Sequence, residues 1–475
     1  MMKKHFLRFS ALTALLFSAL FFSSSSCQKD PDPVVPGDSD PDYSAKIYLR
    51  KEYMDVYYYW YKDVKSRNAS LDATQYDIYD FFDAMLYSKD RWSWMENKDS
   101  YISSETGVVS GTYGASLSQP VEYYNDYSVK VRYVFPGSPF ADQGVTRGWT
   151  LTHINGVEVM TLIRNKTYSS EYAKSPQTFT FLDLNGLPKT FTATAATSLS
   201  TRSFLEAKVF YPVDFNGLTE PVGYFNYRTF RGTMLDDIRE SMAIFKAAGV
   251  KKLILDLRYN GGGDSNASQL LVNFLAPASA DGEVYVTRMH NDILASNNQT
   301  YTISRDGNAL DLDALYFIMG HGSASASEMV YNGLKPLMTT KCVGDTTYGK
   351  PNGMYVLMYP GSNTDYSNYN KGDYSALKYV FLPICFYNKN KLGESIPDDG
   401  FIPDNYRADD MYHDFGVTED NIKACLTHIA TGSFPTLPSK VATSSSSTSR
   451  RSGSKINLAE EEVSEHYGSD LVKKH

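Results

Sequence analysis

The chain has 475 residues, more than a typical single domain holds, so two or three domains are expected. Apolar residues make up 42% and charged residues 21% of the chain, a composition typical of soluble globular proteins. The formal net charge is -8 and no long basic block occurs. This argues against nucleic acid as a partner, because binding to phosphates needs clustered Lys and Arg.

The first residues have the pattern of a secretory signal. Lys and Arg residues near the start precede an apolar run, residues 11–22, that is too short to span a membrane comfortably. A run of serines then leads to Cys27, which resembles the residue that is lipidated in bacterial lipoproteins. We therefore expect a lipoprotein signal peptide over residues 1–27 and a flexible, Pro- and Asp-rich tether over residues 28–42. The alternative is an ordinary signal peptide with an incidental Cys27.

The expected location follows from this anchor. The acidic residues just after Cys27 resemble surface-export signals of some Gram-negative lipoproteins. We expect an outer-membrane lipoprotein of the bacterial cell envelope that faces the periplasm or the cell surface, and whose only membrane contact is the lipid.

Three further cysteines occur: Cys342, Cys385 and Cys425. Their odd number and wide spacing argue against a disulfide framework or a metal site. We expect them to be small buried residues.

Residues 43–104 are predicted to form an N-terminal helical domain. Apolar and aromatic residues recur there at three- and four-residue spacings, in residues 44–64 and again in residues 76–88. The aromatic stripe is interpreted as packing between helices. The stretch DRWSWM, residues 90–95, closes this segment.

Residues 105–198 change to the alternating period of strands, for example in SVKVRYVF and QTFTFLDL. Between these strands, SPFADQGVTRGWTLTHINGVEV resembles a PDZ domain, although Trp149 stands where PDZ domains of proteases commonly have Asp. The resemblance implies that the backbone amides of Tyr113, Gly114 and Ala115 receive a peptide C-terminus. The alternative is a small β-rich domain without a peptide function.

Residues 199–435 alternate between strand and helix patterns. KKLILDLR and ALYFIMG read as buried strands, and MLDDIRESMAIFKAAGV and SNASQLLVNFLA read as helices. Such alternation predicts a mainly parallel sheet covered by helices. The tail over residues 436–475 is of low complexity and is expected to be disordered.

Two strand-to-helix junctions carry residues with catalytic potential. After the first strand come Gly261, Gly262 and Gly263, whose backbone N–H groups could face open space and form half of an oxyanion hole. The stretch matches neither glycine pattern of nucleotide-binding loops, so a phosphate site is the weaker interpretation. The second junction, GHGSASASEMVYNGLK, places Ser325 at the start of a helix, where the helix dipole favours developing negative charge.

A serine nucleophile needs a base. His321 lies four residues upstream, in the turn itself, and Lys350 lies in a Gly-flanked turn downstream. A buried lysine with a lowered pKa can act as such a base.

The motifs DLRYNGGG, SASASE and TTYGK, in this order, resemble the signature of the C-terminal processing peptidases, also called tail-specific proteases. The resemblance covers roughly residues 50–410. It implies a multidomain α/β (α+β) protein with a helical cap, a PDZ-like domain and a ClpP/crotonase-like α/β protease core. It also implies Ser325 as nucleophile, Lys350 as base and no metal or organic cofactor. The implied oxyanion hole consists of Gly262 or Gly263 with Ala326.

The sequence leaves two possible roles for Glu328: support of the lysine or capping of a helix. The positions at which some family members orient the lysine with a third polar residue hold Pro336 and Met354. Glu328 is the remaining candidate for this support, but Ser325-x-x-Glu328 also fits a capping box.

A charged group follows the first of these strands. We expect Asp256, Arg258 and Asn260 to brace the catalytic loops, because charges at the end of a buried strand must be paired.

The sequence thus predicts a serine endopeptidase of the cell envelope that captures accessible C-termini of protein or peptide substrates and cleaves through a Ser–Lys acyl-enzyme. Two rivals remain: a catalytically silent peptide-binding lipoprotein, and a Ser–His hydrolase that uses His321. The sequence specifies neither the physiological substrate nor the oligomeric state.

Overall fold

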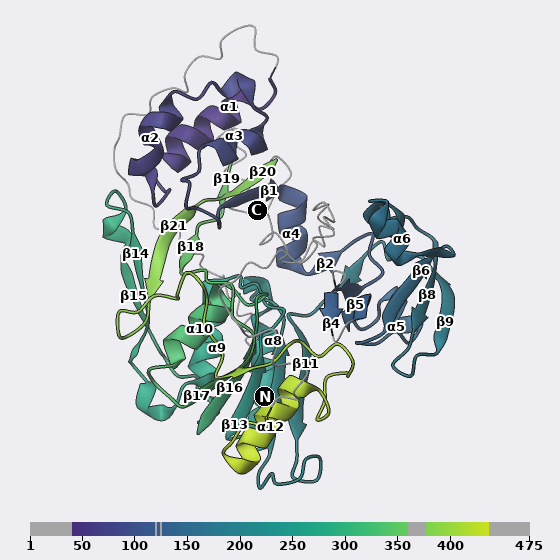
Figure 1. Cartoon of the computed structure of the whole chain (residues 1–475). Helices are drawn as coiled ribbons and strands as arrows, with labels where there is room; N and C mark the ends of the chain where they lie inside the picture. Colours follow the sequence, from purple (N-terminus) through teal and green to yellow (C-terminus); the bar gives the residue numbers. More distant parts are fainter. Residues whose placement is uncertain (1–39, 119–120, 124–125, 360–376, 437–475) are drawn as a thin grey trace, which may run out of the picture.

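A computed structural model of the chain describes residues 40–118, 121–123, 126–359 and 377–436 (Figure 1). The expected signal peptide with Cys27, residues 28–39 of the expected tether, and residues 437–475 of the expected tail lie outside the described residues. None of the helices in the described ranges is long and apolar enough to cross a bilayer.

A six-stranded sheet forms the centre of the molecule. Its strands, in spatial order, are β11 (Phe204–Phe210), β12 (Val222–Tyr227), β13 (Lys252–Asp256), β16 (Ala314–Met319), β17 (Thr340–Gly344) and β22 (Asn405–Tyr406). β11 is antiparallel to β12, and all other neighbours are parallel. Every residue of β12 and β16 is buried, because helices cover both faces of the sheet. This arrangement confirms the expected mixed α/β class.

The two faces of this sheet have separate cores. On one face lie α8 (Leu235–Ala247), α9 (Ser265–Leu275) and α10 (Ala326–Leu334), and on the other lies α12 (Asp420–Thr431). Successive strand residues alternate between them, so that Leu253 and Leu255 face the first group and Ile254 faces α12. Figure 1 shows these helices against the strands.

A second, antiparallel sheet flanks α10. Its order is β15 (Gln299–Thr302), β14 (Val284–His290), β21 (Ile384–Lys389) and β18 (Asn352–Met354). The edge strand β18 begins two residues after Lys350, so this sheet holds the turn that carries the lysine.

The N-terminal segment contains helices, but it is not helical throughout. The helices are α1 (Tyr43–Tyr48), the π-helical η1 (Leu49–Met54), α2 (Tyr61–Ala69), α3 (Ile78–Ala84) and α4 (Lys98–Thr106). Between α3 and α4, β1 (Trp94–Asn97) pairs with β20 (Tyr379–Leu382), which also pairs with β19 (Leu357–Met358). The helix core includes Phe381 and Ile384, so residues 43–104 pack as one body with the distant part of the chain that follows Lys350. Local periodicity could not show this, because the partner strands lie far along the sequence.

Residues 108–200 form a β-rich unit beside the main body. Its sheet contains β3 (Ala115–Leu117), β4 (Val121–Tyr123), β5 (Asp126–Val134), β6 (Thr150–Ile154), β7 (Val157–Glu158), β8 (Gln177–Leu182) and β9 (Pro188–Ala193). Three short helices accompany it: α5 (Pro139–Asp142), α6 (Val159–Arg164) and α7 (Tyr168–Tyr172). The pair β2 (Val108–Val109) and β10 (Leu199–Ser200) brings the entry and exit of this unit together.

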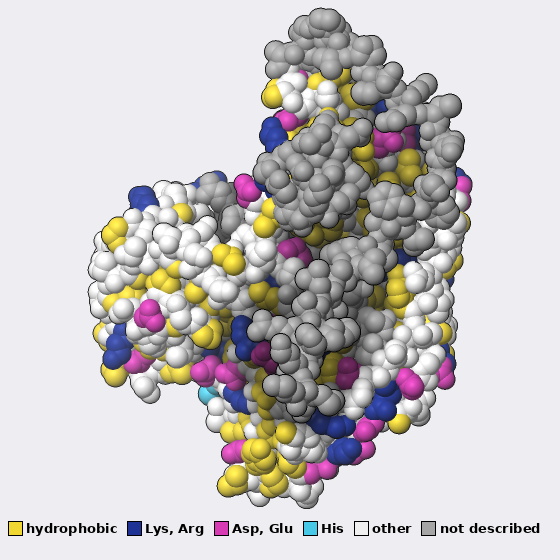
Figure 2. All heavy atoms as spheres, turned by 180° about the vertical axis from the view of Figure 1, so that it is seen from behind, with side chains coloured by type: hydrophobic (Ala, Val, Ile, Leu, Met, Phe, Trp, Pro, Cys, Tyr) yellow, Lys and Arg dark blue, Asp and Glu magenta, His cyan; other side chains and the backbone are white. Residues whose placement is uncertain are grey.

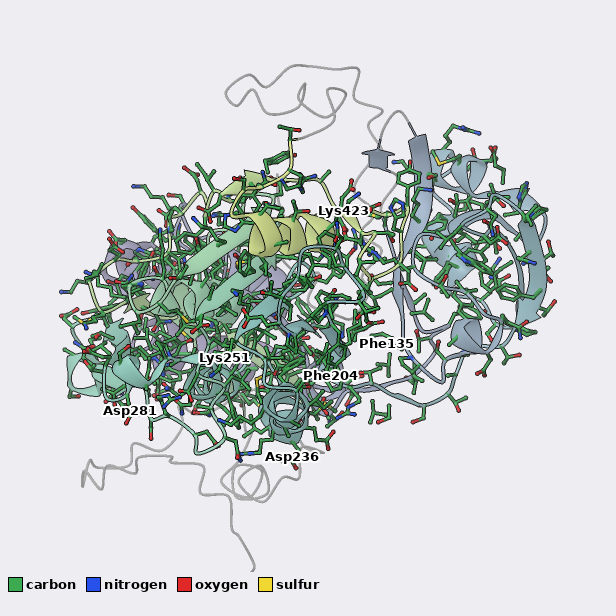
Figure 3. The ribbon with its side chains drawn as sticks, turned by 90° about the horizontal axis from the view of Figure 1, so that it is seen from below. Phe135, Phe204, Asp236, Lys251, Asp281 and Lys423 are labelled. Atoms are coloured by element: carbon green, nitrogen blue, oxygen red, sulfur yellow. The ribbon has the colours of Figure 1, made fainter. Side chains whose placement is uncertain are left out.

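The views from behind and from below show the unit as a lobe of its own (Figures 2 and 3). Four single-turn 3-10 helices complete the described elements: η2 (Ala73–Gln75), η3 (Gly232–Met234), η4 (Ala278–Ala280) and η5 (Ala295–Asn297). Cys342, Cys385 and Cys425 are buried free thiols, as the sequence indicated.

Candidate active site

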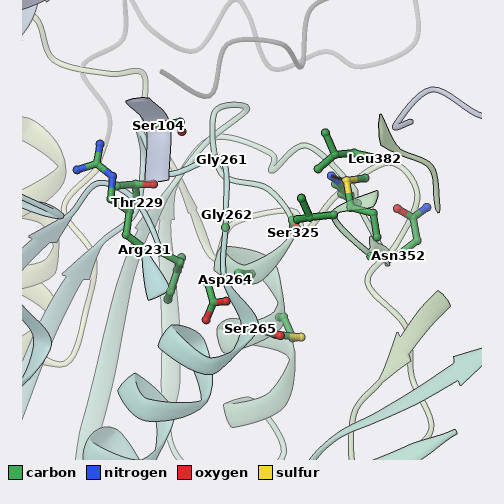
Figure 4. A pocket seen from close by; sticks show the side chains of 18 of the residues that line it. Ser104, Thr229, Arg231, Gly261, Gly262, Asp264, Ser265, Ser325, Asn352 and Leu382 are labelled. Carbon is green, nitrogen blue, oxygen red and sulfur yellow. Dashed lines mark hydrogen bonds between the residues drawn. The ribbon is translucent and has the colours of Figure 1, made fainter. Parts of the chain in front are cut away.

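One pocket, of about 310 Å³, contains both Ser325 and Lys350 among its lining residues. It lies beyond the carboxyl ends of the parallel strands, where the loops after β13 and β16 meet the cap and the second sheet. Figure 4 shows Ser325 between the loop of Gly261 and Gly262 on one side and Asn352 and Leu382 on the other.

Ser325 has an unusual backbone conformation, with φ 54° and ψ -115°. A non-glycine residue in this region is strained, and such strain persists only where the surroundings enforce it. The flanking hydroxyls do so: Ser323 donates to the Leu257 carbonyl and Ser327 to the Asn260 carbonyl, each at 2.7 Å. Of the three serines in this motif, Ser325 is the one that lines the pocket.

The glycine loop lies directly against Ser325. A Cβ on Gly262 would stand 2.8 Å from the Ser325 Cβ, and one on Gly263 would stand 2.1 Å from the Phe230 carbonyl oxygen. Gly262 and Gly263 have φ of +109° and +129°, so both positions suit glycine. The loop can therefore approach Ser325 at Gly262, and the Phe230 backbone at Gly263, only because both side chains are missing.

The backbone N–H groups near Ser325 differ in whether they already donate a hydrogen bond. The Gly262 N–H donates to the Asn260 side-chain oxygen at 2.9 Å. Within the described residues, no hydrogen bond occupies the N–H of Gly263 or of Ala326. Of the two glycine candidates, Gly263 rather than Gly262 therefore has a backbone N–H without a hydrogen bond among the described residues, and so does Ala326.

Hydrogen bonds and ion pairs of Asn260 and Arg258 stabilise the glycine loop. The Asn260 amide donates to the Tyr227 carbonyl at 2.9 Å. Arg258 forms an ion pair with Asp256 at 2.8 Å and another with Glu419, both carboxylates being fully buried. Burial, the largest influence, lowers the pKa of the Arg258 guanidinium, but the carboxylates of Asp256, Glu419 and Asp409 outweigh it and hold this pKa well above its ordinary value. Glu419, from α12's N-terminus, has no sequence pattern that marks it as the partner of Arg258.

Lys350 is only 4% exposed. Burial lowers the pKa of its ammonium from 10.5 to about 8, although the carboxylates of Asp90 and Glu328 oppose this shift. Its Nζ lies 4.5 Å from the centroid of the Trp94 ring and 3.9 Å from the Met354 sulfur. A substantial fraction of Lys350 is therefore neutral near pH 8 and able to accept a proton.

Glu328 connects the two loops. Its carboxylate accepts from the Ser325 N–H at 3.1 Å, the bond that a capping box requires. It also accepts from the Thr347 hydroxyl at 2.5 Å and from the N–H groups of Gly349 and Lys350, each at 2.8 Å. One buried side chain thus joins the start of the helix to the backbone of the lysine turn, and its support of the Lys350 amine itself stays a prediction.

The cap segment, residues 90–97, completes the surroundings of Lys350. Arg91 donates to the Gly349 carbonyl at 2.9 Å, and the Trp92 indole donates to the same oxygen at 3.1 Å. Trp94 covers the ammonium of Lys350 with its ring. Sequence reasoning included this stretch in the family resemblance but assigned it no part in the site.

Trp94→Ala is expected to move the pKa of Lys350 up towards 10.5. The ring both attracts the ammonium and excludes water from it, and exclusion dominates because burial is the largest influence on this pKa. The midpoint of the pH–rate profile for peptide cleavage should rise by about one pH unit. Trp94→Phe, which keeps a ring, is the control and should leave the midpoint nearly unchanged. A downward shift in Trp94→Ala would contradict this account.

His321 is exposed, and its ring lies 5.4 Å from the Tyr348 ring. It is absent from the lining of the described pocket, which Lys350 shares with Ser325. In the described ranges, no three His, Cys, Asp or Glu side chains gather in a way that could hold a metal ion.

The proposed carboxylate loop of the β-rich unit is held by its own neighbours. The Gly114 N–H donates to the Thr112 hydroxyl at 3.0 Å, and its carbonyl accepts from the Phe135 N–H at 2.8 Å. Ala115 begins β3, an edge strand of the sheet, and the Tyr113 ring packs in the core against Phe140. Gly114 therefore offers no unoccupied amide in this conformation.

A buried arginine joins the β-rich unit to the catalytic loops. Arg147 forms an ion pair with Asp409 at 2.7 Å and donates to the Tyr259 hydroxyl at 2.5 Å. Tyr259 directly precedes Asn260, and its hydroxyl also donates to Asp409 at 2.5 Å. The unit is thus attached next to the glycine loop.

Part of the chain is similar to known proteins. Residues 221–379 match the model of peptidase family S41. The chain is 29% identical over 134 residues to the C-terminal processing peptidase, chloroplastic, of Tetradesmus obliquus, covering 28% of this chain and 26% of that protein. It is 25% identical over 129 residues to the "Probable CtpA-like serine protease" of Staphylococcus saprophyticus, covering 27% and 25%. The chain therefore spans about a quarter of the length of these curated relatives.

A solved structure is similar over most of the chain. The crystal structure of a Bacteroides fragilis protein assigned to the S41 proteases has a TM-score of 0.64 and 22% sequence identity. The match covers 81% of this chain and 97% of that one. This likeness concerns the fold.

Proposed function

We propose that this chain, whose residues 221–379 match the model of peptidase family S41, is a serine endopeptidase that works through Ser325 and Lys350. The observation that carries the proposal is a single pocket holding a strained serine, and a buried lysine whose pKa is lowered to about 8. A serine needs a base within its site, and a neutral lysine can be that base.

The chemistry would proceed in two halves. Neutral Lys350 accepts the Ser325 hydroxyl proton while Oγ attacks the scissile carbonyl, and the resulting oxyanion is bound by the N–H groups of Gly263 and Ala326. The intermediate collapses, the C–N bond breaks, and Lys350 returns the proton to the leaving amine. Water then attacks the acyl ester with Lys350 again as base, and the carboxylic acid product leaves with Ser325 restored.

We further propose that the β-rich unit selects substrates by their C-terminal segments. β3 is an edge strand, so a peptide could add to the sheet there as a further strand. The carboxylate would need amides at or near Tyr113, Gly114 and Ala115, and the Gly114 amide would have to leave Thr112 first. Comparing cleavage of one unfolded protein with a free and with an amidated C-terminus tests this: equal rates would contradict it.

We also propose anchoring through Cys27 in the cell envelope. Replacing Cys27 should release the protein from membranes, and its digestion by an added protease on intact cells would show surface exposure. Complete protection would place the protein in the periplasm. A soluble protein with an intact Cys27 would contradict anchoring.

The pH dependence tests the identity of the base. The rate should rise with pH through about 8, because Lys350 accepts a proton only in its neutral form, and fall as pH falls and the ammonium forms. A His base would give a midpoint near its ordinary pKa of about 6.5. The measurement is kcat/KM on an unfolded protein substrate from pH 5.5 to 10.

His321→Ala is the control for this profile and should retain activity and midpoint, since His321 lies outside the pocket lining. Loss of activity in His321→Ala with a midpoint near 6.5 would favour the Ser–His alternative. The absence of any cleavage by the unaltered chain would favour a silent binding protein.

A further inference from the structure

One end of the catalytic pocket extends past Ala326, the residue that follows the nucleophile. Its walls come from the starts of α9 and α10 and from strands β14 and β21. The pocket-lining residues of this region are Ser265, Met329, Arg288, Phe386, Asn388 and Ile396. Because it adjoins the nucleophile, it can receive a substrate group close to the scissile bond.

Arg288 is the cationic side chain of this region. It lies on β14 opposite Asn388 of β21, so both side chains leave the same face of the sheet. Its guanidinium lies 4.0 Å from the centroid of the Phe386 ring, and its Nη2 donates to the Ser265 hydroxyl at 3.3 Å. These contacts hold the planar group in place while leaving its charge uncompensated.

The neighbours of Arg288 carry no negative charge. In the part of the chain that the structure describes, no carboxylate forms an ion pair with it, and the rings of Tyr301 and Phe386 lie against its guanidinium. Its buried Nε has no hydrogen-bond partner there, and neither does the buried side-chain oxygen of Asn388. Arg258, a buried arginine, is by contrast surrounded by carboxylates.

An arginine that is partly withdrawn from water is normally paired with a carboxylate or phosphate. Here the guanidinium without a carboxylate partner lines the pocket in which a substrate would bind. We propose that Arg288 binds a carboxylate of the substrate close to the scissile bond. This inference rests on the proposed peptidase function and adds a substrate class: peptides in which an Asp or Glu side chain, or the free C-terminal carboxylate, lies next to the cleaved bond.

The experiment has two stages. Cleavage sites in a reduced, unfolded protein are mapped by mass spectrometry with the unaltered chain. Peptides around a mapped site are then synthesised with the acidic residue as Glu or Gln, and with the C-terminus free or amidated. We expect kcat/KM to be about 10- to 100-fold higher for the peptide with the carboxylate that Arg288 binds.

The two sources of the carboxylate give different results. A difference between Glu and Gln that survives amidation identifies the side chain, whereas a loss on amidation identifies the terminus. Arg288→Met should bring the ratio of kcat/KM between the preferred peptide and its neutral counterpart towards 1, and Arg288→Lys should keep part of it. Arg239→Met, which removes an exposed arginine of α8, is the matched control and should leave the ratio unchanged.

Two outcomes would overturn the inference for separate reasons. Efficient cleavage with equal kcat/KM for all four peptides would refute the role of Arg288 and leave the peptidase function standing. No cleavage of any substrate by the unaltered chain would refute the peptidase function itself. If Arg288→Met is poorly folded by circular dichroism, the comparison of peptides on the unaltered chain still decides.

Discussion

Ser325→Ala is expected to lower kcat/KM for peptide cleavage by about a thousandfold or more, because the acyl-enzyme cannot form without the hydroxyl. Neighbouring groups hold the strained backbone at this position, and Oγ also takes part in the capping box of the helix. The free energy of unfolding should therefore fall by about 1 kcal/mol, the usual effect of losing an N-cap hydroxyl. The measurements are steady-state cleavage and chemical unfolding of both proteins.

Two further variants test whether the loss of activity is specific to Ser325 and whether Lys350 is the base. Ser327→Ala removes one of the two hydroxyls that hold the Ser325 backbone and should reduce stability by about 1 kcal/mol, with a much smaller loss of activity than in Ser325→Ala. Lys350→Arg should be as inactive as Ser325→Ala at every pH, because a guanidinium does not lose its proton. Activity in Ser325→Ala within tenfold of the unaltered chain would mean that another nucleophile acts.

Glu328→Ala should have the largest effect on stability among the site residues. The side chain is fully buried and accepts four hydrogen bonds, so its removal leaves the Ser325, Gly349 and Lys350 amides and the Thr347 hydroxyl without their partner. We expect a loss of about 3–5 kcal/mol in the free energy of unfolding. Activity should fall as well, because the two loops lose the group that fixes their separation.

Glu328→Gln separates the two roles of this side chain. The amide can still accept with its oxygen but presents N–H groups to one of the amides, so stability should lie between the unaltered chain and Glu328→Ala. Glu240→Ala is the control, since Glu240 is exposed and its ion pair with Arg202 adds little. A fully stable Glu328→Ala would show that the surrounding groups find other partners.

The central strands and helices could be predicted because their patterns are local. β13 and β16 are short apolar runs bounded by turn residues, and α8 has a continuous amphipathic period. β1 could not be predicted, since its four residues become a strand only by pairing with β20. The strand conformation of β1 is set by its contacts with residues that are distant in the sequence.

The same distinction applies to the site. Ser325 and Lys350 stand in short motifs, and the resemblance of these motifs to a family was enough to single them out. Trp94, Arg147 and Glu419 act through contacts between segments that are distant in sequence, and no residue near them marks the partner. Glu328 lies between these cases: the helix signal was local, whereas its bonds to the lysine turn were not.

The sheet shared by β1 and β20 has a consequence for biosynthesis. The Ser93 hydroxyl accepts a hydrogen bond from the backbone N–H of Ile384, which lies 291 residues further along the chain. During translation the N-terminal segment emerges long before that partner exists, so the cap segment stays unpaired until most of the chain is made. Lys350, the proposed general base, consequently acquires its buried environment in one of the last steps of folding. A nascent chain would therefore lack this environment until Ile384 has been synthesised.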